Sequence, residues 1–365
     1  MINTYVTKRN YSIDLLKCLS MLMVIILHLN SYGLRSVEYN PYSAVGITSS
    51  LLRSFSIVGV NVFVLITGYF SSGKSVSISK EGLLGQYKRL IPLWIQVEMY
   101  SIGIYLILCA IPQSGIKFTI QQLIKQSFPV LTNQYWFFTV YFLLILIAPF
   151  INLLIHKLNQ KEYQCLLIVL IGTFSIIPTI NIFGESLGTE YGFSLLWFVV
   201  LYTIGGYIRN YKIKSRRYGW IYLLLVVEFF ICHLLSNVVP GIVSSFLNLF
   251  SNTYTSIFVL AATVSIFLAF LNSKQQYKRV GKIITVLSSL SFAIYLIHEH
   301  NSFRDFLRGR LVNLSKYIDN ISLCLLVMLA SVICIYLLSV FIEFIRVKLV
   351  GMITNVLKRV IIPPQ

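Results

Sequence analysis

The chain has 365 residues, of which 57% are hydrophobic and only 12% are charged, and its formal net charge is +18 at pH 7. A soluble domain typically has about 25% charged residues, so this composition excludes an ordinary soluble enzyme and predicts a polytopic membrane protein. The basic residues occur in short clusters between apolar runs, as the positive-inside rule produces, so we expect no nucleic-acid binding.

The apolar runs predict an all-α integral membrane protein with ten spans in one domain over residues 1–365. The predicted spans are 12–31, 45–70, 90–111, 134–155, 163–181, 193–209, 218–236, 251–271, 282–299 and 321–346. The second is longer than a bilayer requires and can consist of two pieces. Placing both termini in the cytoplasm puts 22 of the 30 Lys and Arg residues inside and 8 outside, so we predict that orientation.

The chain lacks several sequence signatures of soluble enzymes and metal sites. Its six cysteines lie in or beside apolar runs, without CxxC or Cys/His spacing, so we interpret them as small buried hydrophobic residues and predict no metal site. Walker A, GxSxG and HExxH motifs are absent from the sequence, which makes ATP-driven transport by this chain alone an unfavourable hypothesis.

The first predicted span contains three ionisable residues, Asp14, Lys17 and His28. At about 100° per residue, Lys17 and His28 project from one helix face, with Asp14 within about 60° of it and about 16 Å of helix axis between the lysine and the histidine. Such groups are costly in lipid and usually face a protein interior or a wet cavity. We therefore predict that this helix carries the chemistry.

His28 can act as a general base on a sugar hydroxyl during acyl transfer, or it can carry the acyl group as a nucleophile. Lys17 would meet an anionic or polarised donor, with Asp14 in a supporting role. The alternatives are structural, since an interfacial histidine can simply pack, and Lys17 with Asp14 can form a charge pair at the start of a helix.

Other polar groups are expected at the two membrane levels of this helix. His298, Tyr295 and Ser291 fall at the end of the ninth span, level with His28, and are candidates for the acceptor site or for a polar packing stripe. Asn61 belongs to a second polar stripe, in the second span, and is a further acceptor-site candidate.

Lys88 and Arg89 precede the third span, on the level of Lys17, and can contact donor phosphates or simply set the topology. Glu98 and Glu228 are carboxylates within spans for which the sequence suggests no partner.

Six segments occur in an order that resembles a known family. The first is IDLLKCLSMLMVIILH, in which Lys17 and His28 match a basic residue, ten residues and a histidine. The others are GVNVFVLITGYF at 59–70, RLIP at 89–92, YWFFTVYFLLILIAP at 135–149, LWFVVLYTIGGYI at 196–208 and SFAIYLIH at 291–298. Together they resemble the membrane acyltransferase 3 family over about the first 300 residues.

The resemblance implies an O-acyltransferase of the bacterial plasma membrane. Such enzymes commonly take acetyl from acetyl-CoA, with no permanently bound cofactor, and place it on a surface glycan or its lipid-linked precursor. It implies functional roles for Lys17, Arg89 and His28, and a weaker one for His298. This chain departs from the family pattern at two positions. The family more often has Arg where this chain has Lys17, and it often has a second basic residue, three before Arg89, where this chain has Gln86.

Many relatives carry an added esterase-like domain that finishes the transfer. We predict no such domain after the tenth span, so we expect an enzyme that acts alone or with a separate partner, of an oligomeric state that the sequence leaves open. The rival hypothesis is a glycan exporter, flippase or polymerase, which would also be basic and polytopic.

Overall fold

The structure is a computed structural model that describes residues 9–34, 40–73, 79–88, 90–181, 186–214, 217–273, 280–307 and 311–361, without the side chains of residues 32, 33, 86 and 353–361. Within these ranges the chain forms helices and no strands, which confirms the predicted all-α class. The α-helices of eight or more residues are α1 Tyr11–Leu29, α2 Ala44–Ser56, α3 Gly59–Ser71, α4 Lys80–Tyr87, α5 Leu90–Ala110, α7 Trp136–Lys157, α8 Gln160–Ile171, α10 Leu195–Tyr211, α11 Tyr218–Leu235, α12 Ile242–Asn252, α13 Ile257–Leu271, α14 Gly281–His298 and α16 Ile321–Ile361. Short helices include α6 Ile120–Gln126, α9 Ile177–Ile180 and α15 Asn301–Phe306.

Nine helical segments in the described part of the chain are long and apolar enough to cross a membrane. The remaining predicted span, the sixth at 193–209, corresponds to α10, whose 17 residues rise about 26 Å along the axis. This helix is one residue shorter than the 18 residues of the shortest of the nine. The protein is therefore a multi-pass membrane protein.

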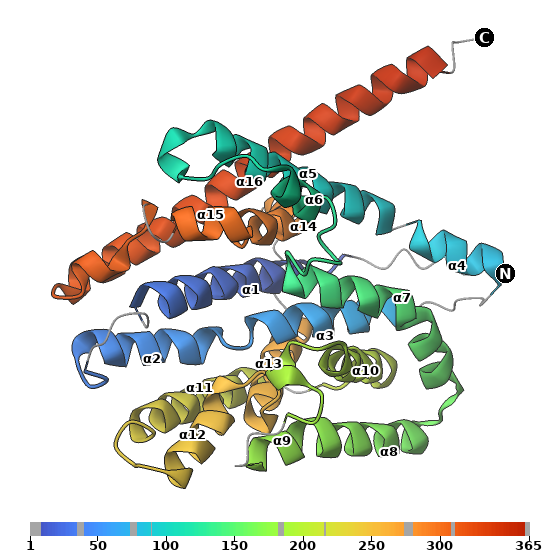
Figure 1. The fold of residues 1–365 in the computed structure, drawn as a ribbon. Coiled ribbons are helices and arrows are strands. Elements are labelled where there is room, and N and C mark those ends of the chain that lie inside the picture. The colour runs from blue at the N-terminus through green and yellow to red at the C-terminus, as the bar shows by residue number, and fades with distance from the viewer. Residues whose placement is uncertain are drawn as a thin grey trace.

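Several predicted spans differ from the helices that form. The long second span is two helices, α2 and α3, separated by a turn at Ile57 and Val58. The eighth predicted span, 251–271, covers the end of one helix, α12, and the whole of the next, α13. The apolar helical segment that these two helices form begins earlier than predicted, at Ile242. The last, 321–346, continues as α16 to residue 361, where it reaches well beyond the bundle in Figure 1.

Helix α1 lies in the middle of the bundle, between α14 on one side and α2 and α3 on the other (Figure 1). It begins after Asn10, whose side chain accepts the backbone N–H groups of Ser12 at 3.0 Å and Ile13 at 3.2 Å. This cap satisfies donors that the first turn would otherwise leave unpaired. Helix α1 passes into a π-helix at Asn30–Leu34, directly beyond His28.

Helices α3 and α10 pack closely because glycines lie at their contact. A Cβ atom on Gly68 would lie 2.3 Å from the carbonyl oxygen of Tyr202, and one on Gly205 would lie 2.5 Å from that of Leu65. Neither position has room for a methyl group, which is typical of close helix contacts in membranes. The contact fixes α3, which forms part of the wall of the cavity described below.

Candidate active site

A cavity of about 360 Å³ lies beside α1, and we call it the α1 cavity. Both Lys17 and His28 line it, which agrees with the prediction that they share one helix face. The other lining residues are Met21, Val24, Val60, Phe63, Ile66, Thr67, Phe70, Ser71, Leu93, Trp136, Phe137, Tyr141, Ser288, Ser291, Phe292 and Tyr295. Most of these side chains are apolar or aromatic. The α1 cavity is therefore largely hydrophobic, with the ammonium group of Lys17 and the imidazole of His28 on the wall that α1 forms.

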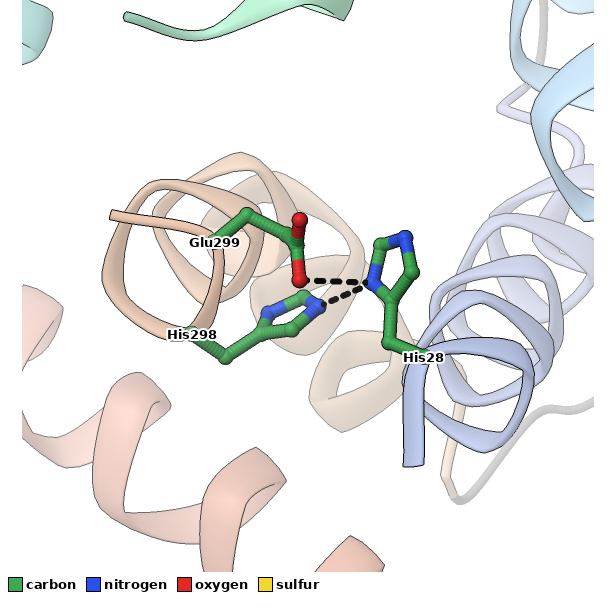
Figure 2. A group of neighbouring side chains, drawn as sticks. All are labelled: His28, His298 and Glu299. Carbon is green, nitrogen blue, oxygen red and sulfur yellow. Dashed lines mark hydrogen bonds and ion pairs between the residues drawn. The ribbon is translucent and has the colours of Figure 1, made fainter. Parts of the chain in front are cut away.

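At the His28 end, α1 meets the C-terminal end of α14. His28 Nδ1 lies 3.0 Å from His298 Nε2 and 3.1 Å from Glu299 Oε1. Figure 2 shows the three side chains converging on this one nitrogen, from two helices far apart in the sequence. His298 and Glu299 are buried, with 2% and 7% of their surface exposed, so these contacts are shielded from water. We call these three residues the histidine cluster.

The contacts of the histidine cluster determine where its protons lie. His298 Nδ1 is 2.5 Å from the carbonyl oxygen of Ile294, so this nitrogen donates and Nε2 of the neutral ring accepts. His28 Nδ1 therefore faces two acceptors, His298 Nε2 and a carboxylate oxygen, and must carry the proton. In the neutral His28 ring the lone pair then belongs to Nε2, on the far side of the ring from both partners (Figure 2). The two contacts fix the orientation of the His28 ring and leave Nε2 as its proton-accepting nitrogen.

Glu299 is held on its other side as well. Its Oε2 atom lies 3.8 Å from a terminal guanidinium nitrogen of Arg304, in the short helix α15 that follows. A carboxylate between an imidazole and a guanidinium stays in one position and favours positive charge on the ring as the base takes a proton.

The histidine cluster can also hold a metal ion, since its three ligand atoms lie within 4.8 Å of one another. Two imidazoles and a carboxylate are a common donor set for catalytic zinc. A metal on His28 Nδ1 would place the ring proton on Nε2 and remove the base described above. The separations of 3.0 and 3.1 Å are those of hydrogen bonds, which account for the geometry by themselves.

Toward the other end of the α1 cavity, Asp14 joins α1 to α14. Its carboxylate accepts hydrogen bonds from Ser288 Oγ at 3.1 Å and Thr285 Oγ1 at 3.2 Å, and Arg9 pairs with it at 2.7 Å. Lys17 lies over the ring of Phe70, with Nζ 5.8 Å from the centroid. Asp14 therefore positions the helices, while Lys17 presents its ammonium group to the cavity.

Comparison with known protein families decides the assignment. The family described as an acyltransferase domain matches residues 10–340, nearly the whole described chain. The chain belongs to the membrane acyltransferase 3 family. Neither a curated protein nor a solved structure gives a match.

Two of the other residues expected at the acceptor site of this acyltransferase line the α1 cavity. Tyr295 accepts the backbone N–H of Phe137 through its hydroxyl oxygen, at 3.3 Å. Its own O–H can then donate to another group. Ser291 also lines the cavity, and its hydroxyl donates to the carbonyl of Ser288 at 2.8 Å.

Asn61, by contrast, is not among the residues that line the α1 cavity. Its Nδ2 donates to the carbonyl of Tyr254 at 2.9 Å, and its Oδ1 accepts from Trp197 Nε1 at 3.0 Å. Both halves of the amide are used in joining α3 to its neighbours, so the structure gives Asn61 a packing environment and not an acceptor-site one.

On the predicted donor side, Lys88 is exposed just after α4, and Arg89 lies outside the described residues. Of the two unassigned carboxylates, Glu228 accepts from Cys232 Sγ at 3.1 Å within α11, and Glu98 is half-buried in α5. Neither lines the α1 cavity.

Glu299 was missed by the sequence reasoning, although it stands beside His298. Helical periodicity turns successive residues by about 100°, which would separate the two side chains. Glu299 follows the last residue of α14, and its backbone leaves the helical conformation there, so its carboxylate reaches the same point as the ring. The clue in the sequence was an acidic residue directly after the histidine, in HEH.

Proposed function

We propose that this membrane acyltransferase moves an acetyl group from acetyl-CoA to a hydroxyl of a surface glycan or of its lipid-linked precursor. The observation that carries the proposal is the pairing of the α1 cavity with the histidine cluster. Lys17 and His28 share one passage, and the cluster holds a proton on His28 Nδ1, so Nε2 has the lone pair of a base.

The donor enters the α1 cavity from the Lys17 side, where the ammonium group attracts the anionic cofactor. Lys17 and His28 are about 16 Å apart along the helix axis. An extended pantetheine arm passing between the aromatic side chains brings the thioester to His28, while the nucleotide stays outside. The positive-inside distribution of Lys and Arg supports a cytoplasmic entrance on the Lys17 side.

In the transfer step, His28 Nε2 takes the proton of the acceptor hydroxyl as its oxygen attacks the thioester carbonyl. Glu299 stabilises the imidazolium that forms. The tetrahedral intermediate expels the CoA thiolate, which takes the proton back from His28, so the products are an O-acetyl ester and CoA. The Tyr295 hydroxyl lines the same cavity and is suited to donate to the developing oxyanion.

Acyl transfer through His28 as a nucleophile uses the same nitrogen and the same cluster. It differs by an acetyl-imidazole intermediate, which would form without the acceptor. The exporter, flippase or polymerase alternative requires no acyl donor and has no use for a base at the end of an apolar passage. Membership in an acyltransferase family also disfavours it.

The test is transfer of label from radiolabelled acetyl-CoA to glycan by the purified protein in liposomes. We expect His28→Ala to lower kcat by at least about 10²-fold, the contribution of a positioned base, and Lys17→Ala chiefly to raise the KM for acetyl-CoA. His156→Ala is the matched control, because His156 is a histidine that does not line the α1 cavity; its Nε2 lies 2.6 Å from the carbonyl oxygen of Ser72. Wild-type protein that binds no CoA and transfers no label would contradict the proposal.

A further inference from the structure

Two hydroxyl groups lie in the α1 cavity between its ends, on side chains that the proposed transfer step does not use. They belong to Thr67 of α3 and Tyr141 of α7, and both residues line the cavity. The two side chains are hydrogen-bonded to each other. Thr67 Oγ1 gives its hydrogen to the carbonyl of Phe63 at 2.9 Å, so Tyr141 donates in this pair and Thr67 accepts. We call Thr67 and Tyr141 the hydroxyl pair.

The position of the hydroxyl pair along the cavity follows from the direction of α3. Helix α2, which leads into α3, contacts the far end of α1, where Asn30 Nδ2 donates to the carbonyl of Ser49 at 2.9 Å. Helix α3 therefore starts toward the histidine cluster and ends near Lys17, whose Nζ lies 5.8 Å from the centroid of the Phe70 ring. Thr67 precedes Phe70 by three residues, about 4.5 Å of helix rise. The hydroxyl pair thus lies about one turn from the ammonium group, on the side of the histidine cluster.

A donor arm in this cavity needs polar partners at that point. The pantetheine arm of CoA carries a hydroxyl and two amides, separated by short apolar links, and an amide that leaves water without a new hydrogen bond costs free energy. Among the described residues, Tyr141 has no hydrogen-bond partner other than Thr67, so its O–H can turn to a ligand carbonyl while Thr67 keeps its bond to Phe63. Both hydroxyl oxygens can also accept an N–H. A plain hydrocarbon chain would leave these groups unused.

Neighbouring aromatic rings hold the hydroxyl pair in place. The ring of Tyr141 stacks on that of Phe137, with centroids 5.8 Å apart and 15° between the planes, and Phe137 meets the edge of Phe63 at 6.5 Å. The spacing of the two hydroxyls is therefore set by the packing of α3 against α7. A site that is already ordered spends little of its binding free energy on ordering side chains.

We infer that the hydroxyl pair binds an amide of the pantetheine arm, and so favours a CoA thioester over an acyl donor without such an arm. The inference rests on the proposed function. It assigns neighbouring parts of the donor to different residues. Lys17 attracts the anionic phosphates, the hydroxyl pair holds the first stretch of the arm, and the thioester continues to His28.

The experiment measures the binding of radiolabelled CoA to purified protein in detergent, and its displacement by unlabelled phosphopantetheine, which is the arm without the nucleotide. The test variants are Thr67→Val and Tyr141→Phe, each of which removes one hydroxyl group and keeps the shape of the side chain. Thr67→Ser keeps the hydroxyl. The matched controls are Thr203→Val and Tyr222→Phe, which remove buried hydroxyl groups of the same kind outside the cavity lining.

We expect CoA to bind about tenfold more weakly to each test variant, and at wild-type strength to Thr67→Ser and to both controls. Displacement by phosphopantetheine should weaken to the same extent in the test variants. The KM for the glycan acceptor should not change, because the histidine cluster is untouched.

Four results would overturn the inference: equal CoA binding in all variants, equal losses in test and control variants, a loss in Thr67→Ser as large as in Thr67→Val, or phosphopantetheine that does not displace CoA from wild type. Acetyl transfer by the wild-type protein would then leave the proposed function standing. CoA binding that depends on the hydroxyl pair, in protein that transfers no acetyl group, would support the inference and reject the transfer.

Discussion

His28 and Glu299 are joined by a 3.1 Å contact between Nδ1 and Oε1, although one lies in the first helix and the other just beyond α14. The contact fixes which nitrogen of His28 carries the proton, and it makes the end of α14 part of the site. A side chain that acts through His28 in this way is a positioning residue.

Replacing Glu299 tests that role. We expect Glu299→Gln, which keeps an oxygen as acceptor but loses the charge, to lower kcat about tenfold, and Glu299→Ala to lower it further. The KM for acetyl-CoA should not change, because Lys17 and the α1 cavity are untouched. Steady-state kinetics with a parallel melting curve checks this. If kcat falls only in proportion to a fall in melting temperature, in both variants, Glu299 is a purely structural residue.

Chelation distinguishes a hydrogen-bonded histidine cluster from a metal site. We expect activity to be unchanged after treatment with EDTA or 1,10-phenanthroline, since His28 Nδ1 carries a proton that a metal would displace. Metal analysis of the purified protein should find less than one equivalent of zinc. Loss of activity on chelation, with recovery on adding zinc back, would overturn the base mechanism.

His300 gives a prediction about pH and stability. Burial lowers its pKa from 6.5 to about 4, and its Nε2 lies 3.0 Å from the carbonyl oxygen of Ser101. Between pH 6.5 and 4 the unfolded chain binds this proton and the folded chain does not, so the free energy of unfolding falls as the pH falls, by about 3 kcal/mol at pH 4. Melting curves in detergent across this range measure the loss.

The control for His300 is His300→Asn. Asparagine can still cap α15, as His300 Nδ1 does by accepting the N–H of Phe303 at 3.4 Å, but it does not titrate. We expect the variant to show a smaller slope of melting temperature against pH between pH 6.5 and 4. The same slope in both proteins would assign the acid sensitivity to other groups.

The contact of α3 with α10 is tested by adding a methyl group. A Cβ on Gly205 would lie 2.5 Å from a backbone oxygen, so Gly205→Ala should force α3 and α10 apart, lower the melting temperature and reduce activity. Gly103→Ala is the matched control, because a Cβ there meets nothing within 4 Å. Alanine at position 103 should leave stability unchanged or raise it by up to about 1 kcal/mol. Equal melting temperatures in the two variants would contradict the close contact.

The helical membrane class followed from composition and apolar runs, because lipid permits few alternatives to a helix with all its backbone hydrogen bonds made internally. The shared face of Lys17 and His28 followed from helical periodicity, and the α1 cavity lies along that face. Asn61 shows the limit of this reasoning. A polar residue on a helix face can serve packing as well as binding, and only its contacts with Tyr254 and Trp197 distinguish the two.

The sequence by itself determined the class, the family resemblance and the one helix on which two costly groups lie, since these depend on apolar content and on spacing within a single helix. Tertiary structure alone decided which partner orients His28 and which of its nitrogens carries the proton. Those features join α1, the end of α14 and α15, and no periodicity within one segment specifies how separate segments meet.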